Sequence, residues 1–571
     1  MVFGRRSIRI NGADCGVEAL LLGAITSVGG FLFGYDTGQI SGMLLFTDFK
    51  NRFGQVDNGD GTKDFEPIIQ SLIVSLMSIG TMLGALGSSY TADWLGRRKN
   101  LSFGTVLFII GSIIQLTAVS SWVHLMMGRF VAGLGIGVLS VGVPMFQSEC
   151  APREIRGAVV ATYQLMITFG ILISNIVNYG TREIEDEPAS WRIVVGLGIA
   201  FSLPLGLGVF MVPESPRWLA AREDWTGARC ALARLRGMKD DLSHGLVEDD
   251  MREMREMIEK ERNVAVGTWK ECVIPKKNGV PKQVYRTFLG MALQFLQQYT
   301  GVNYFFYYGA TIFQSAGVDD PIRVQLILGA INVAMTFYGL YIVERYGRRM
   351  PLFIGAIWQA AWLAVFAAIG TALPPENNKA AGIVMIVAAA MFIASFACTW
   401  GPIIWVVIGE TFPLRTRAKQ ASLATATNWL GNFMISFLTP LATSGISYSY
   451  GFVFVGTNIV AALAVWFFLY ESVSLSLENV DSMYGQSSLK PWTSRKWVPP
   501  GYLSRMQRDD EYFNRHGNGH ATGVDDDEQT VVPSSRPSAA VDAEKISHGV
   551  HKGSNEDIPR ESHEEKVNKV V

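Results

Sequence analysis

Charged residues are scarce in this chain. Asp, Glu, Lys and Arg make up 17% of its 571 residues, whereas a soluble protein carries about 25%. Apolar residues make up 49%, and the mean hydropathy is +0.22 even though the stretch after residue 500 is polar. This composition excludes a string of soluble domains and indicates that most of the chain lies in a lipid bilayer. The formal net charge of −1 also argues against nucleic acid as a partner.

Patterns typical of metal sites and disulfide frameworks are missing too. The cysteines form no C-x-x-C pair, and five of the seven histidines follow residue 515. No short cleavable signal precedes the first apolar run, which begins near Ala19. We therefore expect no metal site and no cofactor, and no sequence motif indicates an enzyme.

Long apolar runs, in contrast, recur as far as residue 470. A helix that crosses a bilayer needs about 20 mostly apolar residues. We therefore expect an all-α membrane protein with twelve transmembrane helices in two six-helix bundles. The twelve candidate segments are roughly 19–46, 67–91, 101–119, 122–149, 157–179, 192–212, 287–315, 322–343, 350–372, 381–409, 420–445 and 450–470.

These segments divide the chain into four parts. We expect an N-terminal six-helix bundle over 1–212, a cytoplasmic loop with short helices over 213–286, and a C-terminal six-helix bundle over 287–472. The remainder, 473–571, is predicted to be a cytoplasmic tail that is mostly disordered, because it is rich in polar and charged residues. An inert extension and a site for tail-binding regulatory proteins both remain open for this tail.

The distribution of basic residues predicts the orientation in the membrane. With the N-terminus in the cytoplasm, the four short cytoplasmic loops hold eleven Lys and Arg residues, and the outer loops hold seven. Cytoplasmic loops of membrane proteins carry an excess of these residues. We therefore expect both termini to face the cytoplasm.

Two motifs occur once in each half of the chain. A D-W-L-G-R-R run begins at Asp93 and an E-R-Y-G-R-R run at Glu344, and a glutamate followed seven residues later by an arginine comes after the fourth and the tenth segments. The usual excess of basic residues in cytoplasmic loops explains the arginines. It does not explain why acidic residues recur at a fixed spacing from them. Duplicated six-helix halves are typical of alternating-access transporters with a site between the halves. We predict an inner gate of interhelical ion pairs made by Asp93, Arg97, Glu149, Arg156, Glu344, Arg348, Glu410 and Arg417.

These motifs belong to a longer ordered set between Gly29 and Tyr484. Its members are GGFLFGYDTGQISG (29–42), DWLGRRK (93–99), GRFVAGLGIG (128–137), PREIRG (152–157), PESPRWL (213–219), QQYTGVNYFFYYG (297–309), VERYGRR (343–349) and GPIIWVVIGETFP (401–413). In this order they resemble the sugar-porter family of the major facilitator superfamily, in its fungal hexose-transporter form. The resemblance implies the major facilitator fold and a plasma-membrane carrier of a monosaccharide, most simply a hexose such as glucose. After the last helix, where the family has P-E-T-K-G, this chain has Y-E-S-V-S from Tyr470.

Polar residues inside the predicted spans indicate a neutral substrate. Beyond Arg286 the C-terminal spans carry no charged residue well inside the membrane, and buried polar groups there are costly unless they serve a purpose. Amides offer donors and acceptors together, as sugar hydroxyls do, and indole rings pack against the apolar face of a pyranose. The predicted substrate-binding residues are Gln297, Gln298, Asn303, Asn332, Trp405, Asn428 and Trp429.

Spacing favours sugar contact for the group Gln297, Gln298 and Asn303, because Gly301 between them permits a helix break. Interhelical hydrogen bonding is the competing explanation, which we favour for Asn332 or Trp429 taken alone. The resemblance adds four residues: Gln164 and Phe396 as sugar contacts, and Tyr307 and Tyr308 as an outer gate.

Two charged residues, Asp36 and Arg129, lie within predicted spans. A lone charge at mid-bilayer costs roughly 3 kcal/mol on insertion scales, so the two are expected to pair. One hypothesis is proton coupling, in which Asp36 takes up a proton outside, releases Arg129 and loses the proton inside. The resemblance implies that proton-coupled sugar porters carry this Asp, but yeast-type facilitators keep it as well. A fixed structural ion pair stays an equal alternative.

A second function remains possible for the whole chain. Some fungal sugar sensors resemble sugar porters and signal through a long cytoplasmic tail. The tail of this chain is shorter and has no internal repeat. Transport is therefore preferred to the alternative of a sugar receptor.

Overall fold

The computed structural model describes residues 7–10, 13–59, 61–151, 153–238, 245–263, 268–275, 280–315, 320–373, 378–413, 416–473, 475 and 477–499. Most of the predicted disordered tail lies outside these residues. The side chains of two predicted gate residues, Arg156 and Glu344, also lie outside the description.

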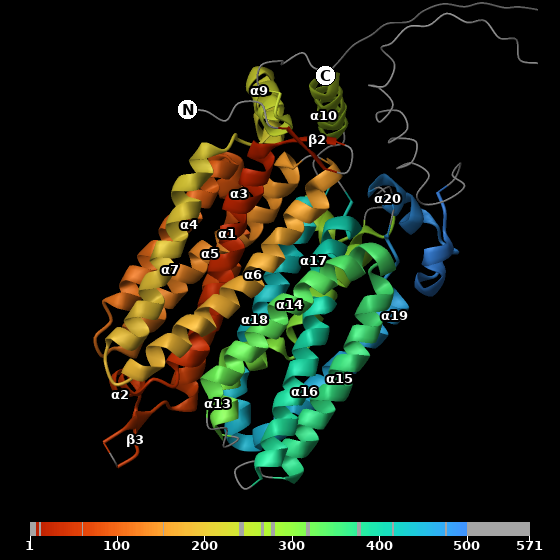
Figure 1. Ribbon diagram of the computed structural model, residues 1–571. Coiled ribbons are helices and arrows are strands. Elements are labelled where there is room, and N and C mark those ends of the chain that lie inside the picture. The colour runs from red at the N-terminus through yellow and green to blue at the C-terminus, as the bar shows by residue number, and fades with distance from the viewer. Residues whose placement is uncertain are drawn as a thin grey trace, which may run out of the picture. The chain divides into compact units, whose positions relative to one another are not determined.

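The first half of the chain forms a helical bundle with short flanking elements (Figure 1). A hairpin of β1 (Ser7–Ile10) and β2 (Ala13–Gly16) precedes it, and a second hairpin of β3 (Val56–Asp57) and β4 (Lys63–Asp64) follows the first long helix. The helices are α1 (Val17–Met43), α2 (Thr47–Phe53), α3 (Pro67–Leu95), α4 (Arg97–Leu116), α5 (Trp122–Cys150), α6 (Arg153–Thr181), η1 (Arg182–Ile184), α7 (Ala189–Gly208) and η2 (Val209–Met211).

The second half forms another helical bundle beside the first. The connection carries α8 (Pro216–Ala221), α9 (Trp225–Arg236), α10 (Gly245–Asn263) and α11 (Trp269–Val273). The bundle is made of α12 (Gln283–Gln298), α13 (Val302–Ser315), α14 (Pro321–Tyr346), α15 (Arg349–Ala372), α16 (Lys379–Cys398), α17 (Trp400–Thr411), α18 (Arg417–Ile446), η4 (Ser447–Tyr450) and α19 (Gly451–Phe468). Two short elements follow it, α20 (Leu477–Gly485) and η5 (Pro491–Lys496).

Among the described residues, ten segments are long and apolar enough to cross a membrane. One of them, Lys419–Phe468, covers most of α18 and all of α19, which makes eleven crossings. The twelfth is the pair α12 and α13, whose 16 and 14 residues are each too short to cross alone. The prediction of twelve transmembrane helices is therefore confirmed.

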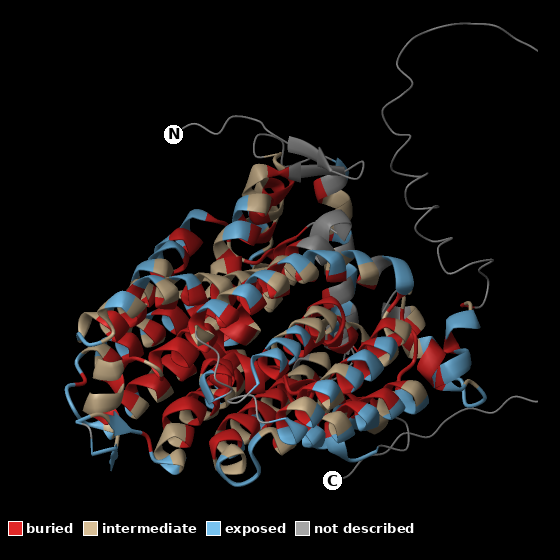
Figure 2. Ribbon diagram, turned by 60° about the horizontal axis from the view of Figure 1, so that its bottom comes forward, coloured by how far each residue is buried: buried red, intermediate tan, exposed pale blue. Residues whose placement is uncertain are grey.

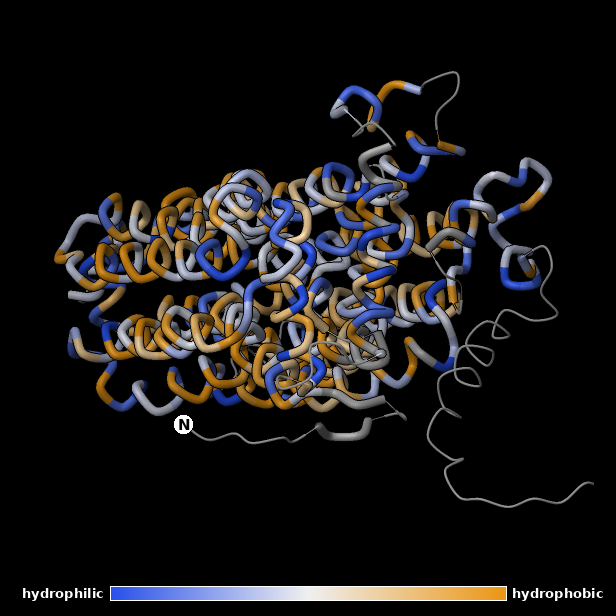
Figure 3. Tube along the Cα trace, turned by 90° about the horizontal axis from the view of Figure 1, so that it is seen from above, coloured by the Kyte–Doolittle hydropathy of each residue, from blue (hydrophilic) through white to orange (hydrophobic). Residues whose placement is uncertain are grey.

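The surfaces of the long helices match a lipid environment. Hydrophobic residues recur along these helices (Figure 3), and buried residues gather where helices face each other (Figure 2). Many large apolar side chains are nevertheless exposed, such as Leu207 at 70% and Ile383 at 62%. In a bilayer these side chains contact acyl chains.

The predicted helix break at Gly301 is present. Gly301 has φ +101°, a left-handed conformation that glycine adopts without strain, and it separates α12 from α13. The carbonyls that the break leaves without helical partners are satisfied from α19: Thr457 donates to Tyr299 O at 2.6 Å and Asn458 donates to Thr300 O at 2.8 Å. Such re-satisfaction is what allows irregular backbone at membrane depth.

A second break was not predicted. The segment 381–409 was expected to form one helix, but α16 and α17 meet at Thr399, whose φ of −126° and ψ of −80° are not helical. Residues of both breaks lie near the same cavity, described below. The irregular backbone is thus confined to the place where a substrate could use it.

The two bundles meet through helices that the repeat relates to each other. The helix α3 packs on α18, and α6 packs on α14. Since α3 and α14 hold the same position in their halves, as do α6 and α18, the two contacts are related by the internal repeat. We call the end of the bundles that carries α2 and β3–β4 the outer end, and the end that carries α9, α10 and α20 the inner end.

Close packing of α1 on α6 is the basis of the first prediction. A Cβ added to Gly34 would lie 1.9 Å from the carbonyl oxygen of Ile167, so Gly34→Ala must push the two helices apart. Overpacking of this kind costs about 1–3 kcal/mol. We expect a lower melting temperature for purified Gly34→Ala and less protein in the membrane. The control is Gly196→Ala in α7, where an added Cβ meets nothing within 4 Å; equal melting temperatures for the two variants would contradict the packing argument.

Candidate functional site

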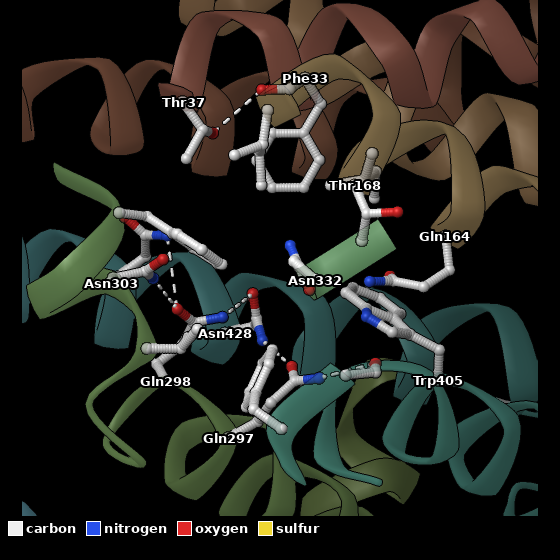
Figure 4. A pocket seen from close by; sticks show the side chains of 17 residues that line it. Phe33, Thr37, Gln164, Thr168, Gln297, Gln298, Asn303, Asn332, Trp405 and Asn428 are labelled. Atoms are coloured by element: carbon white, nitrogen blue, oxygen red, sulfur yellow. Dashed lines mark hydrogen bonds between the residues drawn. The ribbon is translucent and has the colours of Figure 1, made fainter. Parts of the chain in front are cut away.

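A cavity lies between the two bundles. The first half contributes side chains from α1 and α6, and the second half contributes the remainder from α12, α13, α14, α16, α17 and α18 (Figure 4). Its lining residues are Phe33, Thr37, Gln164, Ile167, Thr168, Ile171, Gln297, Gln298, Val302, Asn303, Phe306, Asn332, Phe396, Gly401, Trp405, Asn428 and Asn432. None of these residues is charged.

Gln298 is at the centre of the polar wall. Its Nε2 donates to Asn428 Oδ1 at 3.0 Å, and its Oε1 accepts from Asn303 at 2.5 Å and from Asn432 at 3.3 Å. Asn428 in turn donates to Gln297 Oε1 at 2.8 Å. Four elements of the second half, α12, α13, α17 and α18, are joined in this way, because Gln297 Nε2 also donates to the Trp400 carbonyl oxygen at 2.8 Å. The amides are therefore held in fixed orientations before any ligand enters.

Asn332 differs from these amides. Its side chain is buried, and Oδ1 has no hydrogen-bond partner among the described residues. A buried acceptor without a partner costs free energy that a ligand hydroxyl could recover. The indole of Trp405 and the amide of Gln164 lie beside it in the cavity (Figure 4). An uncharged wall with amide donors, acceptors and an indole suits a neutral polyhydroxylated ligand.

Eight of the nine residues predicted to bind substrate line the cavity, and Trp429 does not. Its buried ring packs edge-on against Phe33, with ring centroids 5.0 Å apart, and Nε1 has no hydrogen-bond partner among the described residues. Trp429 thus supports a cavity residue instead of lining the cavity itself. Other lining residues were not predicted, notably Phe33, Thr37, Thr168 and Asn432. Of these, Asn432 carried the same amide signal as its neighbours in the sequence.

The predicted pair Asp36 and Arg129 does form. Asp36 Oδ2 lies 3.5 Å from Arg129 Nη2, and both side chains are 1% exposed. Gln39 donates to Asp36 Oδ1 at 2.5 Å, and Arg129 donates through Nε to the carbonyl oxygen of Ile73 at 2.9 Å. Asp36 Oδ2 and Arg129 Nη1 have no hydrogen-bond partner among the described residues. The ion pair is therefore loosely hydrogen-bonded for so buried a site.

The two tyrosines of the predicted outer gate are buried and bonded to α18. Tyr307 donates to Asn432 Oδ1 at 3.1 Å, and Tyr308 donates to the carbonyl oxygen of Ser436 at 2.6 Å. The same Asn432 Oδ1 accepts from Ser78 of the first half at 2.8 Å. Asn432 therefore connects the amide wall, the tyrosines of α13 and the first bundle.

The inner-gate arginines adopt the same geometry in both halves. Arg97 donates through Nε and Nη2 to the two carboxylate oxygens of Glu149, each at 2.9 Å. Arg348 donates in the same way to Glu410, at 3.1 and 2.6 Å. In each case Nη1 donates to the carbonyl oxygen five residues earlier in the chain, at 3.1 Å. Paired donors of this kind are strong and directional.

Asp93 and Arg417 are the remaining predicted gate residues that the structure describes. Asp93 lies 3.2 Å from Arg97, but its side chain is 78% exposed. Arg417 donates through Nε to the carbonyl oxygen of Phe412 at 3.3 Å. The bidentate pairs are thus the best-ordered contacts of the predicted gate.

Two Glu-Ser pairs, which were not predicted, hydrogen-bond to the predicted gate residues. Glu214 accepts from the backbone N–H of Arg97 at 3.0 Å, and Glu471 accepts from that of Arg348 at 3.0 Å, so each carboxylate lies at the N-terminus of the helix that follows the motif. Ser215 and Ser472 then donate to the gate glutamates at 2.5 and 2.7 Å. Although Y-E-S-V-S stands where the family has P-E-T-K-G, Glu471 makes the same contact in the second half as Glu214 makes in the first. A Glu-Ser pair after both the sixth and the twelfth spans was the signal in the sequence.

An ion pair also joins the two halves at the outer end. Arg182, in η1 at the end of α6, donates to the carboxylate of Asp320, which caps α14. Arg323 lies 3.4 Å from the same carboxylate, and the Arg182 guanidinium stacks 4.1 Å from the ring centroid of Tyr179. We call Arg182, Asp320, Arg323 and Tyr179 the outer latch.

The latch is insensitive to mild acidity. Burial would raise the pKa of the Asp320 carboxyl, but hydrogen bonds from Arg182 and from the backbone N–H of Arg323 outweigh it and hold the pKa below its ordinary 3.8. A carboxylate with a lowered pKa contributes stability above its unfolded pKa and loses it as the pH falls through the folded value. Asp320 thus stays ionised at neutral and mildly acidic pH.

Comparisons with known proteins identify relatives of the chain. A family described as "Sugar (and other) transporter" matches residues 22–484. The chain is 41% identical over 483 residues to the low-affinity glucose transporter of Kluyveromyces lactis, covering 83% of this chain and 84% of that protein. It is 38% identical over 484 residues to the high-affinity fructose transporter ght6 of Schizosaccharomyces pombe, covering 84% of this chain and 89% of that protein.

A solved structure shares the fold. The major facilitator superfamily proton:xylose symporter XylE, from E. coli, in complex with 6-bromo-6-deoxy-D-glucose, aligns with a TM-score of 0.67 and 25% identity. The alignment covers 82% of this chain and 99% of that one. The predicted two-bundle fold is thereby confirmed.

The outer latch generates the second prediction. Asp320→Asn removes the charge that holds Arg182 and should let the outer ends of the bundles separate more often. We expect an impermeant maleimide added outside to label a cysteine at Ile171, which lines the cavity, severalfold faster in Asp320→Asn. Asp186→Asn, an exposed acid in the loop that follows Arg182, is the control. Unchanged labelling in Asp320→Asn would show that the ion pair does not restrict opening.

Proposed function

Because the chain belongs to the sugar transporter family of the major facilitator superfamily, we propose that it carries a hexose such as glucose across the membrane by alternating access. It is a multi-pass membrane transporter and not an enzyme. The observation that carries the choice of substrate is the uncharged, amide-lined cavity between the bundles. Relatives named for glucose and fructose transport support a hexose.

We further propose that it resides in the plasma membrane with both termini in the cytoplasm. The excess of basic residues in the loops of the inner end supports this orientation. In the proposed cycle, the inner-gate ion pairs keep the inner end of each bundle assembled, so that the two ends can close toward the cytoplasm in the outward-facing state. The outer latch together with Tyr307 and Tyr308 closes the opposite side.

A sugar receptor is the alternative from the sequence, and the relatives above are named as transporters. Uptake of labelled glucose decides between the two functions. A host without hexose carriers of its own should take up labelled glucose when it expresses this chain. A receptor that does not transport would give no uptake although the protein reaches the surface.

Gln298 provides the third prediction. If its amide binds a sugar hydroxyl, Gln298→Ala leaves that hydroxyl unpaired and loses about 1–3 kcal/mol. This corresponds to a roughly tenfold to hundredfold rise in KM for glucose. Trp429→Phe is the matched control, because Trp429 lies outside the cavity lining and its Nε1 has no partner among the described residues. A normal KM in Gln298→Ala at equal surface expression would rule out direct sugar contact.

We also propose that Asp36 carries a proton with the sugar. The buried pair with Arg129, in which Asp36 Oδ2 has no hydrogen-bond partner among the described residues, supports a carboxylate that can exchange a proton. The solved neighbour XylE is named as a proton:xylose symporter, which also supports coupling. A fixed structural ion pair is the competing explanation.

The fourth prediction separates these explanations. With coupling, glucose should evoke an inward current at acidic external pH in the wild type. Asp36→Asn, which imitates the protonated carboxyl, should abolish current and accumulation but keep glucose exchange. Asp320 does not titrate in the mildly acidic range, so pH dependence between neutral and mildly acidic conditions would not come from the latch. If the wild type shows no glucose-evoked current, Asp36 is a structural partner of Arg129.

A further inference from the structure

A basic and aromatic patch lies just after the last transmembrane helix, on and beside η5. Its members are Lys490, Trp492, Arg495 and Lys496, all of them exposed. The chain has no acidic residue from Ser482 to Arg508, so the positive charge is not compensated within the segment. The Lys490 ammonium lies 5.4 Å from the centroid of the Trp492 ring. We refer to these four residues as the η5 patch.

Trp492 lies against the end of a membrane-spanning helix. Its ring packs edge-on against Phe467 of α19, with centroids 6.2 Å apart. Phe467 and Phe468 are 49% and 51% exposed, and they end a segment that is apolar enough to cross the membrane. Trp492 itself is 43% exposed. Tryptophan at such a position typically lies at the level of the lipid headgroups.

The opposite side of η5 is fixed to the protein. Ser494 Oγ accepts from the backbone N–H of Glu471 at 2.8 Å, and Trp497 is buried against a cluster that contains Tyr470 and Tyr484. Because these contacts hold the segment in place, a ligand would meet a patch that is already ordered. Glu471 also accepts from the backbone N–H of Arg348, so two hydrogen bonds connect Ser494 of η5 to a residue of the predicted inner gate.

We propose that the η5 patch binds the headgroups of anionic phospholipids in the leaflet at the inner end. Three cations beside an interfacial tryptophan match the chemistry of such a headgroup, which presents a phosphate and a net negative charge to basic residues. The patch adjoins the exposed apolar end of α19, because Trp492 packs against Phe467. This position favours a lipid over a soluble protein as the ligand of the patch. The lipid holds η5 against α19 and thereby steadies Glu471 and the inner gate.

The fifth prediction measures lipid binding directly. Purified full-length protein in detergent is titrated with short-chain phosphatidylserine, phosphatidylcholine or inorganic phosphate, and binding is followed by native mass spectrometry. Each cation adds up to about fivefold to the affinity for an anionic surface. We expect phosphatidylserine to bind in preference to the other two. Lys490→Gln/Arg495→Gln/Lys496→Gln should weaken its binding at least about tenfold.

A charge-matched variant provides the control. Lys63→Gln/Arg252→Gln/Lys379→Gln removes three exposed cations elsewhere on the molecule and should bind phosphatidylserine as the wild type does. A second readout locates the lipid: phosphatidylserine with brominated acyl chains should quench tryptophan emission less in Trp492→Phe than in the wild type. Phosphatidylserine binding that is equal in the η5 variant and the control, or no preference over phosphatidylcholine, would overturn the proposal.

The proposal uses the proposed function only to state which leaflet is involved. The binding assay needs no sugar and no transport, so it can succeed even if the hexose is wrong. Conversely, the η5 variant in phosphatidylcholine vesicles should still take up glucose, because none of its changed residues lines the cavity. No preference for phosphatidylserine in the wild type, together with intact glucose uptake, would refute the lipid site alone.

Discussion

Within a bilayer, a polar group must find its partner inside the protein, and the architecture of this chain follows from that constraint. The break between α12 and α13 is possible because Thr457 and Asn458 of α19 take up the carbonyls it exposes. The same constraint assembles the amides around Gln298 into a connected wall. A hydrated sugar can exchange its water for such a wall, since donors and acceptors are already oriented. The network that joins these helices is therefore the same one through which the proposed sugar binding would occur.

The internal repeat gives the two halves equivalent ion-pair clusters at their inner ends. Each half places an arginine from its G-R-R motif on a glutamate at the end of another helix, and a Glu-Ser pair secures both partners. Paired charges that are partly buried gain from such additional hydrogen bonds. Because these clusters join elements of the same half, each bundle keeps its inner end assembled as a unit. Contacts between the halves are fewer and include the Arg182–Asp320 pair at the outer end.

Much of this could be predicted from the sequence, and the misses have physical causes. Apolar runs define the twelve helices because burial in lipid requires them, and Gly301 marks a break since its φ of +101° suits glycine. The break at Thr399 involves no positive φ and so had no such marker. Trp429 was placed in the cavity because residue type cannot say which face of α18 it occupies. Partner choice, such as Glu149 with Arg97, depends on helix packing that spacing does not encode.

The two halves contribute different kinds of side chain to the cavity lining. Six of its seven amide side chains come from the second half, whereas the first half contributes one amide with two threonines and three apolar side chains, Phe33, Ile167 and Ile171. A ligand held by amides would therefore move with the second bundle, while the first bundle presents to it a half-apolar face with a single amide. In that case the choice of sugar would depend on the amides of the second half, and the transport rate would depend on the facing surface of the first half. Substitutions in the first half could then change the transport rate of a protein with this fold without changing which sugar it binds.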